Sequence, residues 1–431
     1  MHSPNPRRFN RRDMLWNTAL GAGGIGLTAL LAEAGLAAQQ EENPFAPKPT
    51  HFTPRAKSVI FLYMDGGPSQ VDTFDPKPLL QAESGQPFKM EIQPTQFDNN
   101  GNTLGSPWKF QQYGESGLPV SDLFPHVATC ADDLCVLRSM TSKFSEHTNA
   151  NYFLHTGHGL QGRPSMGAWA AYGLGTECQN LPAYVVLNGG LIPPGGLDCF
   201  GSGFLPATFQ GSIFKDGANP VADISRREPT ESAQLRKLKL MRQLDEQLLQ
   251  ETGEIDAIES AIRNYELAFR MQMEVPELMD IQSETQATQE MYGLNSPVDG
   301  LKTFGRSCLI ARRLVERGVR FVQLYSGTGS KWDSHTAIEA NHSRLCRSID
   351  KPVDGLLKDL RQRGLLDETL VIWGGEFGRT PMSEKGNGRD HNPTGFSIWM
   401  AGGGVRGGQV IGATDELGLY AIEDRMHVRD I

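Results

Sequence analysis

The sequence SVIFLYMDGGP, residues 58–68, decides the fold. Its first part, from Ser58 to Met64, is a short apolar run, and Asp65 follows directly with two glycines and a proline behind it. A short apolar run bounded by glycine and proline is typical of a strand that is buried on both faces of a sheet. Ligands of parallel α/β sheets gather beyond the carboxyl ends of the strands. Asp65 is therefore a candidate metal ligand, with the capping of a following turn as the alternative.

Further acidic or histidine-bearing turns stand in a similar relation to apolar runs. They are Asp333 and His335 after VRFVQLY (319–325), Glu376 after TLVIWGG (369–375), and Asp390 and His391 before GFSIWMA (395–401). Carboxylates and imidazoles are the ligands of hydrolytic metal sites. Groups at the ends of strands that share a sheet can meet in one crevice, so the sequence predicts a metal centre there.

Predicted helices and strands alternate over the C-terminal half of the chain. Helices are predicted over 298–317 and 339–363, and short apolar strands over 319–325, 369–373 and 396–401. Such alternation is typical of a parallel sheet covered on both faces. We therefore expect an α/β fold with a mostly parallel central sheet and helices on both faces.

A change of composition marks an insertion in this pattern. Residues from about 228 to 290 are charged, contain little glycine or proline, and carry leucines at helical spacing from Leu235 to Leu249. They predict a helical insertion of about two helices within a domain that spans 58–431.

The N-terminus carries paired arginines, Arg11 and Arg12, ahead of an uncharged, weakly apolar stretch. Together with the small residues up to Ala38, this order resembles a twin-arginine export signal over 1–38, and an uncleaved anchor helix is the alternative. A linker would follow over 39–57. We expect the twin-arginine export machinery as a partner, a periplasmic or extracellular location, and no stable membrane span after cleavage.

Composition narrows the class of protein. The 431 residues carry a formal net charge of −9, with a pI of about 5.6. A nucleic-acid-binding protein normally presents a basic face, so we expect no nucleic-acid partner. The six cysteines include no CxxC pair of the kind used for structural zinc or redox chemistry.

Three further residues are candidates for catalysis. Thr148 can act as a nucleophile if a metal ion lowers its pKa, and His147 beside it can be a ligand. Arg379 follows Glu376 by three residues. Its guanidinium can bind the oxygens of a phosphate or sulfate, or it can form an ion pair with Glu376 that only holds the loop.

Taken in order, these turns resemble the alkaline phosphatase superfamily. More narrowly, the chain resembles the exported bacterial sulfatase-like family known as domain of unknown function 1501. The matching stretches are DGGPSQVDTFDPK (65–77), LRSMTS (137–142), LHTGH (154–158), GVRFVQLYSG with WDSH (318–335), and ETLVIWGGEFGRTP with GRDHNPTGFSIWMAGGGVRGG (368–408).

The resemblance implies two neighbouring metal ions. Asp65 matches the ligand after the first strand, and Glu376 falls where the aspartate of an Asp-His pair belongs. Asp333, His335 and His391 match the ligands of the second ion. The sequence departs from the family pattern at Phe377, which stands where the histidine of that pair belongs. It departs again at the nucleophile position, which falls on His147 with Thr148 one residue later.

The resemblance also implies an activity. We expect an exported, metal-dependent hydrolase of phosphate or sulfate esters that uses zinc, calcium, magnesium or manganese ions. Its substrate would be a phosphorylated or sulfated compound. The alternative is a non-catalytic binding or surface-assembly module on a degenerate sulfatase-like scaffold. Because the family continues beyond segments like HVRDI (427–431), we also expect further residues after Ile431 in the whole protein.

Overall fold

The computed structural model describes residues 44–93, 99–188, 192–215, 220–221, 224–252, 256–326 and 331–431. The chain divides into two compact units, Met1–Ala46 and Pro47–Ile431, and the elements named below lie in the second. The predicted export signal over 1–38 lies outside the described residues. None of the described helices is long and apolar enough to cross a membrane.

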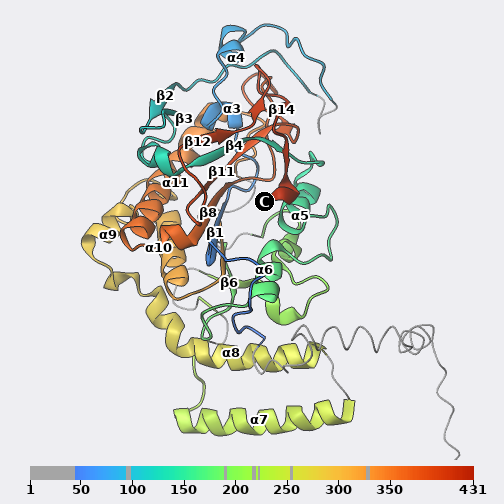
Figure 1. The fold of residues 1–431 in the computed structure, drawn as a ribbon, viewed down its shortest axis with the longest axis vertical. Helices are drawn as coiled ribbons and strands as arrows, with labels where there is room; N and C mark the ends of the chain where they lie inside the picture. The colour runs from blue at the N-terminus through green and yellow to red at the C-terminus, as the bar shows by residue number, and fades with distance from the viewer. Residues whose placement is uncertain are drawn as a thin grey trace, which may run out of the picture. The chain divides into compact units, whose positions relative to one another are not determined.

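A nine-stranded sheet forms the centre of the second unit (Figure 1). In spatial order its strands are β12 (Gln409–Ile411), β4 (Cys135–Thr141), β11 (Phe396–Ala401), β8 (Thr369–Gly374), β1 (Ser58–Tyr63), β7 (Phe321–Tyr325), β5 (Tyr184–Leu187) and β6 (Ser212–Phe214), with β15 (Met426–His427) paired to β4. β11 runs antiparallel to both of its neighbours, and the other pairings are parallel. The predicted mostly parallel sheet is confirmed.

Strand β1 shows why the sheet is covered on both faces. Ile60 and Leu62 belong to one buried apolar cluster, and Phe61 and Tyr63 belong to another. Successive side chains of a strand point to opposite faces, so a strand that is apolar throughout needs a cover on each side. This explains the continuous apolar run in the sequence.

Helices provide these two covers. The cluster that contains Ile60 is built with α10 (Leu301–Glu316) and α11 (Ile338–Gln362). The cluster that contains Phe61 includes residues of α5 (His147–Thr156) and packs against α6 (Met166–Leu174). Helices therefore lie on both faces of the sheet, as the sequence predicts.

Two long helices lie in the region of the predicted insertion, α7 (Glu231–Thr252) and α8 (Asp256–Met279). The short α9 (Gln286–Met291) follows them. The remaining short helices are α3 (Gln70–Thr73), α4 (Pro78–Ala82), and the 3-10 helices η1 (Val127–Asp133), η2 (Gly196–Phe200), η3 (Ala207–Phe209), η4 (Ile281–Ser283), η5 (Leu366–Glu368) and η6 (Val428–Asp430). The remaining strands form pairs: β2 (Phe110–Tyr113) with β3 (Leu118–Ser121), β9 (Gly378–Arg379) with β10 (His391–Asn392), and β13 (Ala413–Thr414) with β14 (Ala421–Glu423).

A buried ion pair between Asp72 and Arg389 joins the segment after β1 to the segment before β10. Arg389 donates from Nε to Asp72 Oδ2 at 2.8 Å and from Nη2 to Asp72 Oδ1 at 3.1 Å. Both side chains are fully buried. Asp72 lies in α3 after β1, and Arg389 lies two residues before His391. The pair therefore fixes the turn after β1 against the segment that carries His391.

We expect Asp72→Ala to lower the free energy of unfolding by about 3–5 kcal/mol, because it leaves the Arg389 guanidinium buried without its carboxylate. Denaturant unfolding followed by circular dichroism measures the change. Asp367→Ala, which removes an exposed carboxylate, is the matched control and should change stability by less than about 0.5 kcal/mol. A loss below about 1 kcal/mol for Asp72→Ala would show that the ion pair does not hold the loops.

Candidate metal centre

Asp333, in the turn after β7, lies at the centre of a cluster of nitrogen atoms. Its Oδ1 accepts from Arg379 Nη2 at 2.7 Å. The Nε2 atoms of His335 and His391 lie 2.9 and 3.1 Å from the same oxygen. His147 Nε2 lies 3.3 Å from the other oxygen, Oδ2. Burial opposes ionisation of Asp333, but the bonds to the three imidazoles and the guanidinium charge outweigh it and hold the pKa of Asp333 well below its usual range.

His147 is the first residue of α5. The carboxylate of Glu146 caps this helix by accepting backbone N–H groups of its first turn. His147 Nδ1 lies 2.7 Å from Glu376 Oε1, which leaves Nε2 directed at Asp333. Burial disfavours the imidazolium, but the two carboxylates prevail and raise the pKa of His147 to about 9.

His335 lies in the loop between β7 and α11 and is held in the same way. Its Nδ1 contacts Glu384 Oε2, and its Nε2 lies near Asp333 and 3.0 Å from His391 Nε2. Burial again opposes protonation, but the bonds to Asp333 and Glu384 raise the pKa of His335. A second carboxylate thus fixes the ring on the side away from the centre.

His391, in β10, completes the set of imidazoles. Its Nδ1 donates to the backbone oxygen of Ser145 at 2.6 Å, so Nε2 is the nitrogen that faces Asp333. The ring stacks on Phe377, with centroids 4.4 Å apart. Burial, reinforced by the nearby charge of Arg379, lowers the pKa of His391 to about 4.

The arrangement has two properties of a metal site. Each imidazole bonds an acceptor through Nδ1 and directs Nε2 to a shared centre, which is how metal-binding histidines are usually oriented. Ligand atoms about 2.1 Å from one ion lie about 3.0–3.4 Å from one another. The Nε2 contacts with Asp333 oxygens span 2.9–3.3 Å. His147, Asp333 and His391 therefore offer ligand atoms close enough together for one divalent ion, and His335 lies beside them.

Asp390 adds a carboxylate beside this cluster. Asp390, His335 and His391 offer ligand atoms that lie within 4.8 Å of one another, and a second such group is formed by His147, Asp333 and His391. Asp390 is fully buried, and its Oδ2 has no hydrogen-bond partner among the described residues. A buried carboxylate oxygen without a donor is costly unless a cation faces it, so this atom also fits a nearby ion.

Glu376, expected as a metal ligand, lies behind His147. Its carboxylate accepts from Tyr63 Oη at 2.7 Å and from the backbone N–H of Gly66 at 3.0 Å, while its Oε1 faces His147 Nδ1. The side chain is fully buried. With these partners, Glu376 orients an imidazole, and it is absent from both groups of close ligand atoms.

Asp65, expected as the first-strand ligand, is buried in the turn after β1. Its backbone oxygen accepts from the N–H of Trp332 at 3.1 Å, so the turn after β1 does meet the turn that carries Asp333. Burial raises the pKa of Tyr63 and of Tyr325, and the nearby Asp65 carboxylate adds a smaller effect in the same direction. Asp65 belongs to neither of the two groups of close ligand atoms among the described residues.

Arg379, expected to bind a substrate anion, is buried and its donors are used within the protein. Nε donates to the backbone oxygen of Gly67 at 3.0 Å, and Nη1 to that of Arg389 at 3.1 Å. Nη2 donates to Gly66 O and to Asp333. Binding a substrate anion would require these bonds to break. The guanidinium therefore holds the Asp333 carboxylate in place instead.

Thr148, expected as a nucleophile, is the second residue of α5. Its backbone N–H donates to Glu146 Oε1 at 2.9 Å. Thr148 therefore takes part in the capping of the helix through its backbone.

Phe377 and Glu384 contact the histidines of the cluster, and the sequence analysis did not predict these contacts. The Phe377 ring packs against both His391 and His147, at centroid distances of 4.4 and 5.0 Å, so it forms an apolar wall where the family pattern has a ligand. A Cβ atom on Gly67 would meet this ring at 2.8 Å, which explains one of the glycines after Asp65. Glu384 lies far from any predicted strand, and no local pattern marks it as a partner of His335.

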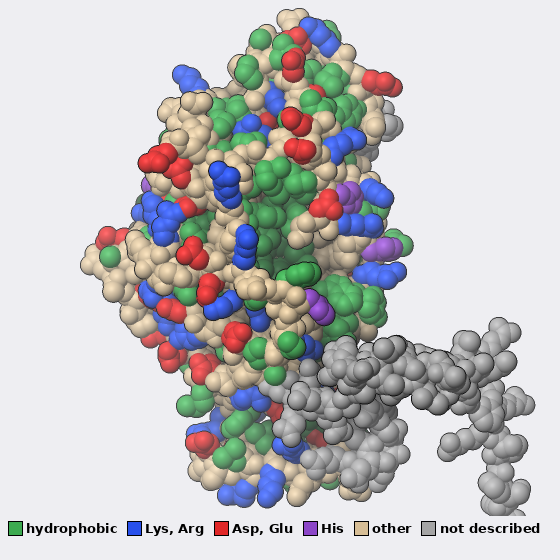
Figure 2. All heavy atoms as spheres, in the orientation of Figure 1, with side chains coloured by type: hydrophobic (Ala, Val, Ile, Leu, Met, Phe, Trp, Pro, Cys, Tyr) green, Lys and Arg blue, Asp and Glu red, His purple; other side chains and the backbone are tan. Residues whose placement is uncertain are grey.

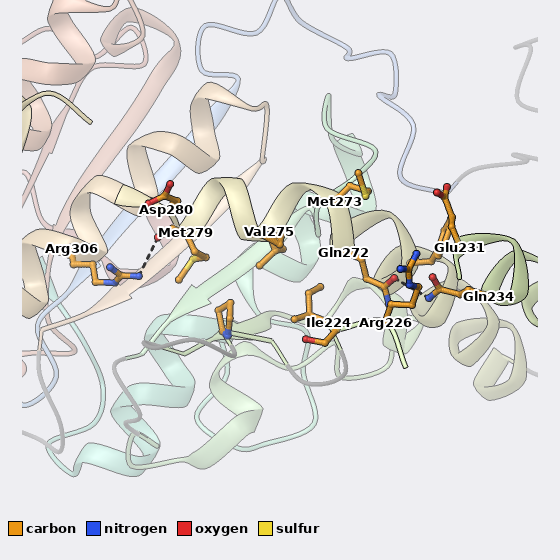
Figure 3. Close-up of a pocket in the computed structure, with 14 residues that line it drawn as sticks. Ile224, Arg226, Glu231, Gln234, Gln272, Met273, Val275, Met279, Asp280 and Arg306 are labelled. Atoms are coloured by element: carbon orange, nitrogen blue, oxygen red, sulfur yellow. Dashed lines mark hydrogen bonds between the residues drawn. The ribbon is translucent and has the colours of Figure 1, made fainter. Parts of the chain in front are cut away.

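The cavity that reaches the cluster is smaller than another cavity that lies elsewhere in the described part of the chain. A cavity of about 750 Å³ lies between α8 and the segment around residue 224, with Val275 and Met279 on one wall and Ile224 and Arg226 opposite (Figure 3). It shares no residue with the cluster. A smaller cavity of about 280 Å³ reaches His391 and is also lined by Lys143, Ser145 and Thr380.

Glu384→Gln should weaken metal binding about 10–100-fold, because a neutral amide is a poorer partner for the His335 ring than a carboxylate. Calorimetric titration with Zn²⁺ and, separately, with Mn²⁺ measures the affinity. Glu423→Gln, at an exposed glutamate, is the control and should leave it unchanged. Equal affinities for the Glu384 variant and the control would remove Glu384 from the centre.

Solved structures with a related chain arrangement include a sulfatase, a lipoteichoic acid synthase and an alkaline phosphatase. The PsFucS1 sulfatase from Pseudoalteromonas sp. is 12% identical, with 92% of this chain and 69% of that chain covered and a TM-score of 0.35. The lipoteichoic acid synthase LtaP from Listeria monocytogenes is 9% identical, with 84% and 76% covered and a TM-score of 0.33. The alkaline phosphatase from the Antarctic bacterium TAB5 is 9% identical, with 83% and 95% covered and a TM-score of 0.31.

With TM-scores below 0.5 and such low identities, these likenesses do not bear on the activity of the chain. No curated protein matches it significantly in sequence. A family model does match, over residues 56–431, which is most of the chain. The chain belongs to the family described as "Protein of unknown function (DUF1501)".

Proposed function

We propose that the protein is a metal-dependent hydrolase of phosphate or sulfate esters. The observation that carries the proposal is the convergence of three imidazoles on one carboxylate. The Nε2 atoms of His147, His335 and His391 lie 2.9–3.3 Å from Asp333 oxygens, and each ring is fixed through Nδ1. Metal-binding histidines are usually oriented in this way, which supports a role of the three imidazoles in metal binding.

In this proposal Asp333, His147, His335 and His391 hold a divalent ion, with Asp390 beside them. Zinc, manganese, magnesium and calcium are the candidates, and the imidazole nitrogens favour zinc or manganese over the other two. The ion would supply Lewis acidity that polarises an ester oxygen and lowers the pKa of a hydroxyl or water. Glu376, Glu384 and the Ser145 carbonyl keep the imidazole rings oriented, and Arg379 keeps the Asp333 carboxylate in place.

The cavity of about 280 Å³ next to His391 is the proposed substrate site. Lys143 lines it and is exposed, so its ammonium can neutralise a phosphate or sulfate group. This role replaces the one expected for Arg379, whose donors are already used. The attack on the ester is assigned to a water molecule, whose pKa a bound ion would lower.

The proposal includes export. Arg11 and Arg12 with the stretch that follows resemble a twin-arginine signal, so we place the mature protein in the periplasm or outside the cell, where it would meet phosphorylated or sulfated compounds. The twin-arginine machinery would carry the chain in its folded form.

The second candidate function is a binding or surface-assembly module without catalysis. Phe377 in a ligand position favours it, since it departs from the family pattern. It differs from the hydrolase in one measurable way: the protein would contain metal and hydrolyse no ester.

We expect His335→Ala to lose bound metal and hydrolysis together, because the variant lacks one of the imidazole nitrogens that would bind the ion. Metal content is measured by mass spectrometry of the purified protein, and activity on chromogenic aryl phosphates and aryl sulfates. His126→Ala, at an exposed histidine, is the control and should keep both. In the same assay Thr148→Val should stay active. Hydrolysis by metal-free protein would exclude the mechanism, and metal without turnover in the unmodified chain would favour the binding module.

Lys143→Ala should raise KM roughly tenfold with little change in kcat, since the lost charge binds the anion equally in the ground state and the transition state. The effect should shrink at high salt. Lys109→Ala, at an exposed lysine outside this cavity, is the control. An unchanged KM on every hydrolysed ester would place the substrate elsewhere.

A further inference from the structure

Polar side chains that are not metal ligands also lie in the interior of the protein, between α5 and the sheet. Figure 2 shows charged side chains of both signs spread over one face of the molecule. By contrast, the side chains of Tyr63, Asn151, His155 and Gln323 are buried, although each carries a hydrogen-bonding group. Burial of such a group is costly unless it finds a partner. The bonds that these groups form therefore show what the arrangement holds in place.

Tyr63 and Asn151 close a ring of hydrogen bonds that includes His147. The Tyr63 hydroxyl lies 2.5 Å from Asn151 Oδ1 and 2.7 Å from Glu376 Oε2, so its one proton is shared between two acceptors. Asn151 donates from Nδ2 to the backbone oxygen of His147 at 2.9 Å. Glu376 Oε1 lies 2.7 Å from His147 Nδ1. The ring therefore holds His147 at two points, its backbone and its imidazole.

His155 attaches this part of α5 to the sheet. Its Nδ1 donates to the backbone oxygen of Asn151 at 2.8 Å, and its Nε2 accepts from Nε2 of Gln323, in β7, at 2.8 Å. Burial lowers the pKa of His155 to about 4, so the imidazole is neutral at pH 7 and can accept this bond. Gln323 is held in turn, because its Oε1 accepts from the Tyr184 hydroxyl at 2.6 Å. Asn151 is thus fixed from β7 as well as from Tyr63.

We propose that Tyr63 and Asn151 are positioning residues of the metal centre, which fix His147 so that its Nε2 binds the ion. Neither side chain touches the ion in this proposal. Tyr63 acts through Glu376, whose Oε2 it bonds, and Asn151 acts through the backbone of His147. The inference rests on the proposed function in one respect, since an ion must bind at the cluster.

The ring reduces the ordering that metal binding requires. His147 is the first residue of α5, and a free imidazole at a helix end has rotamers to lose when it binds an ion. Because the ring fixes His147 before the ion binds, less conformational entropy is lost on binding and the affinity is higher. Glu376 alone would fix the imidazole but not the backbone that carries it. The same bonds also stabilise α5 against the sheet, so the experiment has to separate metal affinity from stability.

Tyr63→Phe removes the hydroxyl and keeps the ring, so it should weaken Zn²⁺ binding to the full chain about 10–100-fold in a calorimetric titration. Tyr292→Phe is the matched control, because Tyr292 is fully buried and donates to Asp359 Oδ2 at 3.0 Å, outside the cluster. Both variants should lower the denaturant midpoint similarly, and only Tyr63→Phe should lose affinity. Equal affinities overturn this inference and leave the metal centre standing. An unmodified chain that binds no Zn²⁺ or Mn²⁺ overturns both.

Asn151→Ala opens the ring at a second point and tests the inference independently of the folding of Tyr63→Phe. It should also weaken Zn²⁺ binding about 10–100-fold. Asn149→Ala is the control on the same helix, since Asn149 Nδ2 donates to the Gly159 oxygen at 2.7 Å, outside the ring. The double variant of Tyr63→Phe with Asn151→Ala should bind little more weakly than either single variant, because both changes open one ring. Losses that multiply in the double variant, or an equal loss in Asn149→Ala, contradict the ring.

Discussion

The orientation of three imidazoles is the constraint on which the site depends. Each ring must bond an acceptor through Nδ1 so that Nε2 faces the Asp333 carboxylate, and the acceptors come from different parts of the chain: Glu376, Glu384 and the Ser145 carbonyl. None of these contacts is local in sequence. The fold therefore has to bring the ends of β7 and β8, the start of β10 and the start of α5 together before the centre exists.

Sheet order explains how this happens. β1 lies between β7 and β8 and is parallel to both, so the turns after the three strands emerge at the same edge. Buried ionic contacts then fix those turns. Arg379 bonds the backbone of the turn after β1 and the Asp333 carboxylate, and Arg389 bonds Asp72. Because desolvation offsets much of the attraction between buried charges, the net gain in stability from these contacts is small.

The sequence predicts the fold better than the site. The apolar runs of β1, β7, β8 and β11 and the periodicity of α10 and α11 are local patterns, and each element forms where it is predicted. The turns of Asp333, His335, Asp390 and His391 do meet. By contrast, the roles of Glu376, Arg379 and Thr148 depend on which neighbour each side chain finds. Arg379 suits an anion by its chemistry, yet in the fold it lies under backbone carbonyls, and no spacing in the sequence reveals this. α5 is equally hard to predict, because it buries Asn151 and His155 among its apolar residues.

A crystal structure of protein purified with its native metal, with anomalous scattering data at the absorption edge of that metal, tests the account most directly. The account predicts an anomalous peak about 2.0–2.2 Å from Nε2 of His335 and His391 and from an oxygen of Asp333. A peak located instead beside Asp65 and Tyr325, or bound metal that lies nowhere near these imidazoles, would contradict it.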